Sequence, residues 1–146
     1  MTLAAILIWY IGIGVLAAVG TVTISRARFS PRVEQRFFAL LLIPIAGMYL
    51  VFVAYFGDGP VPAPEAYAVV VFVMLGLLGL RFPALLVLGY ALHGGWDLAH
   101  EVRVHLDGAS GTRPLTDIPL AYGAFCAAYD WWMAGYFLMR LPAWRL

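Results

Sequence analysis

The chain has 146 residues, of which 64% are hydrophobic and only 12% are charged. An average soluble domain carries about 25% charged residues, and several apolar runs here approach or exceed the ~20 residues that cross a bilayer. The composition therefore predicts an all-α, polytopic membrane protein with one transmembrane domain over residues 1–146. The net charge of +1, without a basic patch, gives no reason to expect a nucleic-acid partner. A single cysteine, Cys126, excludes an intrachain disulfide.

Five apolar runs predict five transmembrane helices. The first run lacks the positive n-region of a signal peptide and is long for a cleaved signal, so we expect it to be retained as a helix. An arginine-rich segment follows it, and segments rich in glycine and proline separate later runs. The predicted helices span residues 3–25, 37–56, 66–80, 84–105 and 118–139.

Arginine positions predict the orientation, because the chain has no lysine. Five crossings place most arginines on one side of the membrane, and by the positive-inside rule that side is cytoplasmic. The N-terminus is then outside and the C-terminus cytoplasmic, in a multi-pass protein of a bacterial inner membrane. The alternative is four crossings, with residues 66–80 and 84–105 forming a re-entrant pair. The arginines assigned to the cytoplasmic side are Arg26, Arg28, Arg32, Arg36, Arg81, Arg140 and Arg145, which leaves Arg103 and Arg113 outside.

The segment YALHGGWDLAHEVRVH, residues 90–105, contains all three histidines of the chain. On a helix at about 100° per residue, His93, Asp97 and His100 fall within roughly 60° of arc. Ionisable groups inside a membrane helix are costly, so they usually have a function or a partner. The segment therefore predicts a polar stripe on one face of helix 84–105.

The helix over 118–139 brings another acid, Asp130, to the same depth as His93. At a rise of ~1.5 Å per residue, each lies ~18 Å from the outer end of its helix. Small residues on the face of Asp130 predict close packing of helices 84–105 and 118–139, with a polar cleft opening to the outer face. These residues are Pro119, Gly123, Cys126 and Ala134.

Imidazole and carboxylate groups at this spacing are suitable ligands for a divalent transition metal. His93, Asp97 and His100 would bind it from one helix and Asp130 from the other, a set that fits zinc, iron or manganese. An open coordination position would permit hydrolysis or oxidation. Two alternatives stay open: a structural polar network, and a path for protons or a ligand.

Four further residues adjoin this centre. Glu101 and Asp117 lie near the outer mouth and are candidates for a catalytic general acid or base. Cys126 is more typical of an inert buried thiol than of a ligand. Trp96 is typical of packing or of an interface belt, and less so of the wall of an apolar ligand pocket.

Three functions are consistent with these features. The first is a metal-dependent membrane enzyme acting on a lipid or isoprenoid-like substrate. The second is a non-enzymatic accessory or assembly subunit of a larger membrane complex, which the small size and short loops favour. The third is a small proton-coupled transporter acting as an oligomer. The expected partners are the lipid bilayer, an apolar small-molecule ligand, and further copies or subunits.

Three segments resemble a family of small bacterial integral membrane proteins of unknown function. GYALHGGWDLAHE, residues 89–101, resembles the family's H-x-x-W-D-x-x-H core, and residues 35–50 are similar to its second helix. CAAYD, residues 126–130, resembles an element near its C-terminus. The resemblance carries no activity. It implies a polar centre made of His93, Trp96, Asp97, His100 and Asp130.

Overall fold

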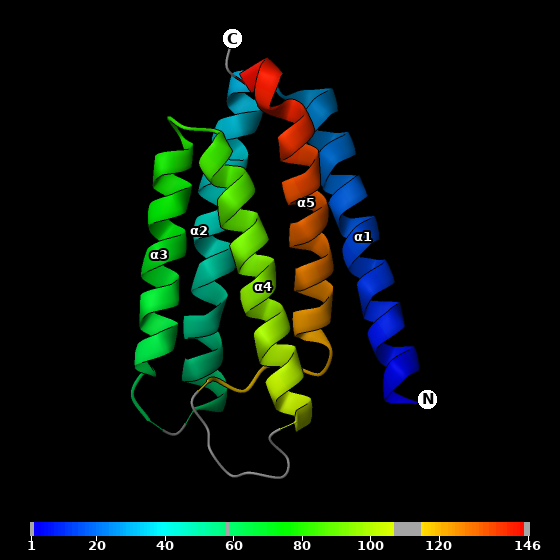
Figure 1. The fold of residues 1–146 in the computed structure, drawn as a ribbon, viewed down its shortest axis with the longest axis vertical. Helices are drawn as coiled ribbons and strands as arrows, with labels where there is room; N and C mark the ends of the chain where they lie inside the picture. Colours follow the sequence, from blue (N-terminus) through cyan, green and yellow to red (C-terminus); the bar gives the residue numbers. More distant parts are fainter. Residues whose placement is uncertain (1, 58, 107–114, 145–146) are drawn as a thin grey trace.

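The computed structural model describes residues 2–57, 59–106 and 115–144 and forms an up-and-down bundle of five helices within them (Figure 1). Consecutive helices run antiparallel, so the first and last helices end at the same end of the bundle, opposite the N-terminus (Figure 1). The all-α fold with five helices is thereby confirmed. The helices are α1 (Leu3–Arg28), α2 (Pro31–Phe56), α3 (Ala63–Gly79), α4 (Ala84–Leu106) and α5 (Tyr122–Trp144).

The helix α2 begins six residues earlier than the apolar pattern predicts. Ser30 is its N-cap residue and Pro31 its first residue, a position where the missing N–H of proline costs no hydrogen bond. Glu34 in the first turn complements the positive end of the helix dipole. The arginine-rich segment is therefore mostly helical, and only Phe29 and Ser30 separate α1 from α2.

The helix α5 begins later than predicted, at Tyr122 rather than at Ile118. Pro119 disfavours helical geometry at the residue before it, and its carbonyl accepts a hydrogen bond from the Tyr122 N–H in a turn. Ala121 in this turn has a positive φ of 59°. At its other end, α5 continues through Pro142 to Trp144.

Small residues allow α4 and α5 to pack closely, as the sequence predicts. A Cβ atom on Gly123 would collide with the backbone carbonyl of Asp97 and would lie 2.9 Å from the Cβ of Glu101. Farther along the same pair of helices, Gly94 lies against the indole of Trp131. The close approach brings the polar stripe of α4 against α5.

A buried carboxylate joins three helices at the end of the bundle where the chain terminates. The Glu34 side chain is 0% exposed. Its Oε2 accepts hydrogen bonds from Arg140 Nη2 at 2.7 Å and from Trp144 Nε1 at 3.1 Å, and its Oε1 accepts one from the Tyr136 hydroxyl at 2.5 Å. Ser25 on α1 lies 3.2 Å from the same carboxylate. Arg140 therefore has a structural partner, in addition to its predicted role in orientation.

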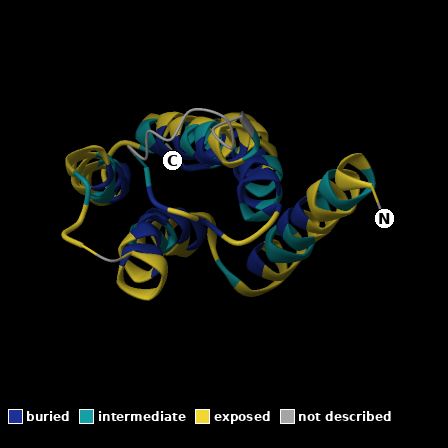
Figure 2. Ribbon diagram, turned by 90° about the horizontal axis from the view of Figure 1, so that it is seen from below, coloured by how far each residue is buried: buried dark blue, intermediate teal, exposed yellow. Residues whose placement is uncertain are grey.

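The bundle is apolar outside and contains buried ionisable groups. Figure 2 shows exposed residues on the outward faces of the helices and buried residues on the faces turned inward. Large apolar side chains stand on the surface, such as Leu16 at 71% and Met139 at 75% exposure. In contrast, six acids and histidines are 0–1% exposed: Glu34, Glu65, His93, Asp97, His100 and Asp130.

Within the described ranges, two helices are long and apolar enough to cross a membrane, Leu3–Arg28 and Pro31–Phe56. The helix Ala63–Gly79 is apolar but shorter. The helices α4 and α5 carry the charged groups of the polar centre in place of a continuous apolar run. Two of the arginines used to predict the orientation, Arg113 and Arg145, lie outside the described residues.

Candidate metal centre between α4 and α5

His93, Asp97 and Asp130 meet in the middle of the bundle. His93 Nδ1 lies 2.7 Å from Asp130 Oδ2 across the α4–α5 interface and 3.0 Å from Asp97 Oδ2 one turn along α4. The three side chains are 0–1% exposed. We call these residues the central triad. The contact between His93 and Asp130 agrees with the equal depth predicted for them.

Tyr49 on α2 connects the central triad to a third helix. Its hydroxyl donates a short hydrogen bond to Asp97 Oδ1. On α3, the ring of Phe72 packs edge to face against the ring of His93, with centroids 4.7 Å apart. Asp97 thus has both oxygens engaged, one by Tyr49 and one by His93. The arrangement holds the carboxylate in one orientation, which preorganises a ligand or a proton acceptor.

Two buried atoms of the central triad lack a hydrogen-bond partner among the residues described. They are His93 Nε2 and Asp130 Oδ1. Buried polar atoms are almost always satisfied, so each indicates a water molecule, a proton or an ion. The two carboxylates also face a single imidazole, which can neutralise only one of their charges even when protonated.

The distances within the central triad are compatible with a metal ion after a small expansion. One ligand atom from each residue can be chosen so that all lie within 4.8 Å of one another. Bonds of about 2.0–2.2 Å to a tetrahedral ion separate the ligand atoms by about 3.3–3.6 Å. The present contacts of 2.7 and 3.0 Å would have to lengthen by about 0.3–0.9 Å.

A second buried cluster adjoins the central triad on the side of the α2–α3 connection. His100 Nε2 lies 2.7 Å from Glu65 Oε1, which also accepts the backbone N–H of Thr116 at 2.9 Å. The rings of Tyr49 and His100 pack with centroids 4.5 Å apart, so the two clusters are contiguous. Glu65 Oε2 and Thr116 Oγ1 are buried without a partner in the described part of the chain.

The structure thus directs His100 to Glu65 and away from the central triad. Its Nδ1 lies 3.0 Å from the backbone oxygen of Trp96, so neither ring nitrogen is directed at Asp130. The helical arc between His93 and His100 is small, but seven residues separate them by about 10 Å along the axis. The ligand set that the structure brings together is therefore the central triad without His100.

The two candidate general acids or bases also lie outside the central triad. Glu101 accepts hydrogen bonds from the Ala124 N–H at 3.3 Å and pairs with His105 Nε2 at 2.8 Å. Asp117 is exposed beside a surface pocket that also contains Thr116 and Pro60. Both lie toward the end of the bundle with the long connections, as predicted.

Cys126 and Trp96, which were predicted beside the polar centre, each have a buried polar atom. Cys126 is a free, buried thiol on α5. Trp96 packs its indole against His100 at 5.2 Å, and its Nε1 is a fifth buried polar atom without a partner among the residues described. The expected cleft is closed at the central triad, since each of its side chains is at most 1% exposed.

Sequence reasoning missed Tyr49 and Glu65. Tyr49 lies in an apolar run and Glu65 in a segment predicted to be a loop, and only the tertiary structure places them against α4. Glu65 had a signal of its own, because it is the single acid in the first turn of an otherwise apolar helix. An isolated acid in such a helix is expected to have a buried partner.

The fold and the site define a class: an all-α bundle with a buried cluster of one histidine and two carboxylates. The chain belongs to a family of unknown function, DUF6010, whose model matches residues 7–143. The predicted resemblance to a family of unknown function over most of the chain is thereby confirmed. No curated protein and no solved structure matches the chain.

Proposed function

We propose that this chain is an integral membrane protein whose central triad binds one divalent transition metal, and that it carries out metal-dependent chemistry on a lipid or isoprenoid-like molecule. The observation that carries the proposal is the meeting of His93, Asp97 and Asp130, from two helices, in an apolar interior. Zinc, iron and manganese are the ions that one nitrogen and two oxygen ligands suit.

The charge of the central triad favours a cation. Two ionised carboxylates against one imidazole leave a net negative charge even when the imidazole is protonated, and burying such a charge is costly. A divalent ion would neutralise both carboxylates, and bidentate binding by Asp130 would also satisfy its unpartnered oxygen. Three protein ligands would leave a coordination position for a substrate oxygen or a water molecule, as in catalytic zinc sites.

The membrane location is supported by the distribution of side chains over the bundle. Large apolar residues on the surface and ionisable residues inside suit a lipid environment. An 18-residue window of helix α1 has a mean hydropathy of 2.3, although only 11% of that window is buried inside the bundle. Such a helix is stable against hydrocarbon and would expose a large apolar surface in water.

The proposed orientation predicts which connections are cytoplasmic. The bundle is antiparallel, so α1 ends at the arginine-rich end and α5 ends there too (Figure 1). A fluorescent protein fused after Leu146 should fold in the cytoplasm and fluoresce, and alkaline phosphatase fused there should be inactive. Fusions within the connection before Ala63 should give the opposite pair of results. Equal results at both places would contradict five crossings.

Metal binding is tested by elemental analysis of protein purified from membranes. We expect about one zinc, iron or manganese ion per chain in the native protein and less than about a tenth in His93→Gln or Asp130→Asn. His100→Gln and Glu101→Gln are matched controls, because each replaces a buried ionisable group of α4 outside the central triad by a neutral amide. They should keep the metal.

The control variants make the result specific. A native protein without metal, or equal loss of metal in His100→Gln and Asp130→Asn, would overturn the metal site. Circular dichroism and gel filtration should confirm that each variant retains its helices and its size. Loss of metal with an intact fold would separate a metal ligand from a residue needed for folding.

A second candidate function is proton transfer. The observation that favours it is the contiguity of the central triad with the Glu65–His100 pair through the ring of Tyr49. The contacts of His93 Nδ1 also have hydrogen-bond lengths. A proteoliposome flux that responds to a pH gradient and is lost in Asp97→Asn, in protein free of metal, would favour this function over the first.

A further inference from the structure

A groove of about 580 Å³ lies between α1 and α5, outside the contacts that hold the central triad. Its walls are largely apolar, with Val19 and Val22 on α1 and Met139 on α5. Gly135 forms part of its floor, and a Cβ atom there would meet no other atom within 4 Å. The groove is therefore space that no side chain of the described residues fills.

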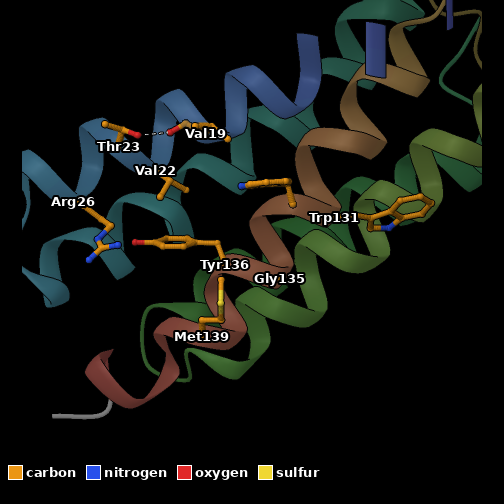
Figure 3. A pocket seen from close by; sticks show the side chains of 9 residues that line it. Val19, Val22, Thr23, Arg26, Trp131, Gly135, Tyr136 and Met139 are labelled. Carbon is orange, nitrogen blue, oxygen red and sulfur yellow. Dashed lines mark hydrogen bonds between the residues drawn. The ribbon is translucent and has the colours of Figure 1, made fainter. Parts of the chain in front are cut away.

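One end of the groove is cationic. Arg26, in the last turn of α1, and Tyr136 reach toward each other there (Figure 3). Within the described part of the chain, Arg26 has no carboxylate within ion-pair distance, and Glu34 is bound by Tyr136 and Arg140. Its guanidinium is exposed and offers its donors to a ligand.

The shape and charge of the groove fit one occupant. From Val19 to Arg26 the wall extends about 10 Å along the helix axis, enough for the upper part of an acyl chain. The charged end lies at the arginine-rich end of the bundle, where a headgroup would be located if the chain spans the membrane. A guanidinium binds phosphate oxygens with two parallel hydrogen bonds.

We propose that this groove is a binding site for one anionic phospholipid, with its phosphate on Arg26 and an acyl chain between α1 and α5. This proposal rests on the membrane location in the proposed function but not on the metal. The unneutralised charge of Arg26 favours an anionic lipid over a zwitterionic one, because only the anionic headgroup has a net negative charge to pair with it.

Native mass spectrometry of detergent-purified protein, titrated with phosphatidylglycerol or phosphatidylcholine, tests the site. The native chain should bind the first lipid more tightly than the second. Arg26→Gln should weaken phosphatidylglycerol binding about fivefold and phosphatidylcholine binding by less, because both lipids have the phosphate but only the first has a net negative headgroup. Gly135→Leu should fill the groove and abolish binding of both lipids at this site.

Two matched controls separate the groove from general charge and surface effects. Arg28→Gln removes the same charge from the same turn of α1 but does not line the groove. Gly20→Leu adds the same side chain at a position on α1 that is open and outside the groove. Both should bind phosphatidylglycerol within about twofold of the native chain.

Equal weakening in Arg26→Gln and Arg28→Gln, or unchanged binding in Gly135→Leu, would overturn the lipid site. Metal analysis of the same samples distinguishes this failure from failure of the metal centre, because the groove variants leave the central triad intact. Recovery of the native chain in the soluble fraction, by contrast, would overturn the membrane location on which both proposals rest.

Discussion

Replacing Glu34 by alanine should lower the free energy of unfolding by about 3–5 kcal/mol. The change leaves the buried Tyr136 hydroxyl and Trp144 indole without their acceptor, at about 1–3 kcal/mol each. It also removes the partner of Arg140, whose side chain is 22% exposed and can regain some hydration. Ser25 loses little, because its hydroxyl has a second acceptor in the carbonyl of Val22.

The loss can be measured by unfolding the protein from mixed micelles with sodium dodecyl sulfate. Glu101→Ala is a suitable control, since this acid is also buried but, among the residues described, accepts only from His105 and a backbone N–H. We expect it to cost about 1–2 kcal/mol. If Glu34→Ala proves no more destabilising than Glu101→Ala, Glu34 does not join the three helices as described.

The second large effect is expected from a single added methyl group. Gly123→Ala should destabilise the protein by about 2–3 kcal/mol, because the new Cβ collides with the carbonyl of Asp97 and with Glu101. A backbone carbonyl in mid-helix cannot move aside, so α4 and α5 must separate. Since His93 and Asp130 lie on opposite sides of that interface, the variant should also lose bound metal.

Gly135→Ala adds the same methyl group to the same helix and is the control for Gly123→Ala. A Cβ atom there meets nothing within 4 Å. Alanine is favoured over glycine in a helix interior by about 0.5–1 kcal/mol, so this variant should be neutral or slightly more stable. Equal effects of the two substitutions on stability and metal content would contradict the close packing of α4 against α5.

Periodicity and composition were enough to predict the helices that carry the site. Apolar runs separated by glycine and proline predicted five helices, and the start of the helix at residue 84 was correct. The boundaries that were wrong depend on local chemistry outside the apolar runs. Pro31 starts α2 within a charged segment, and Pro119 delays the start of α5.

The candidate site could be predicted in part, for a geometrical reason. His93 and Asp97 are one helical turn apart, so their proximity follows from the chain itself. His93 and Asp130 are 37 residues apart, and equal depth on antiparallel helices was enough to predict their contact. The partner of His100 could not be found this way, because Glu65 lies on α3, whose rotation and register relative to α4 depend on packing.

The sequence by itself determined an all-α, apolar chain with all three of its histidines on one helix. Both properties are local, since they depend on which residues follow one another. Three contacts were decided only by the tertiary structure: Tyr49 orients Asp97, Glu65 pairs with His100, and Glu34 accepts hydrogen bonds from side chains of α5. Each of these contacts joins residues at least 35 positions apart, so it depends on how whole helices pack and not on any pattern within one of them.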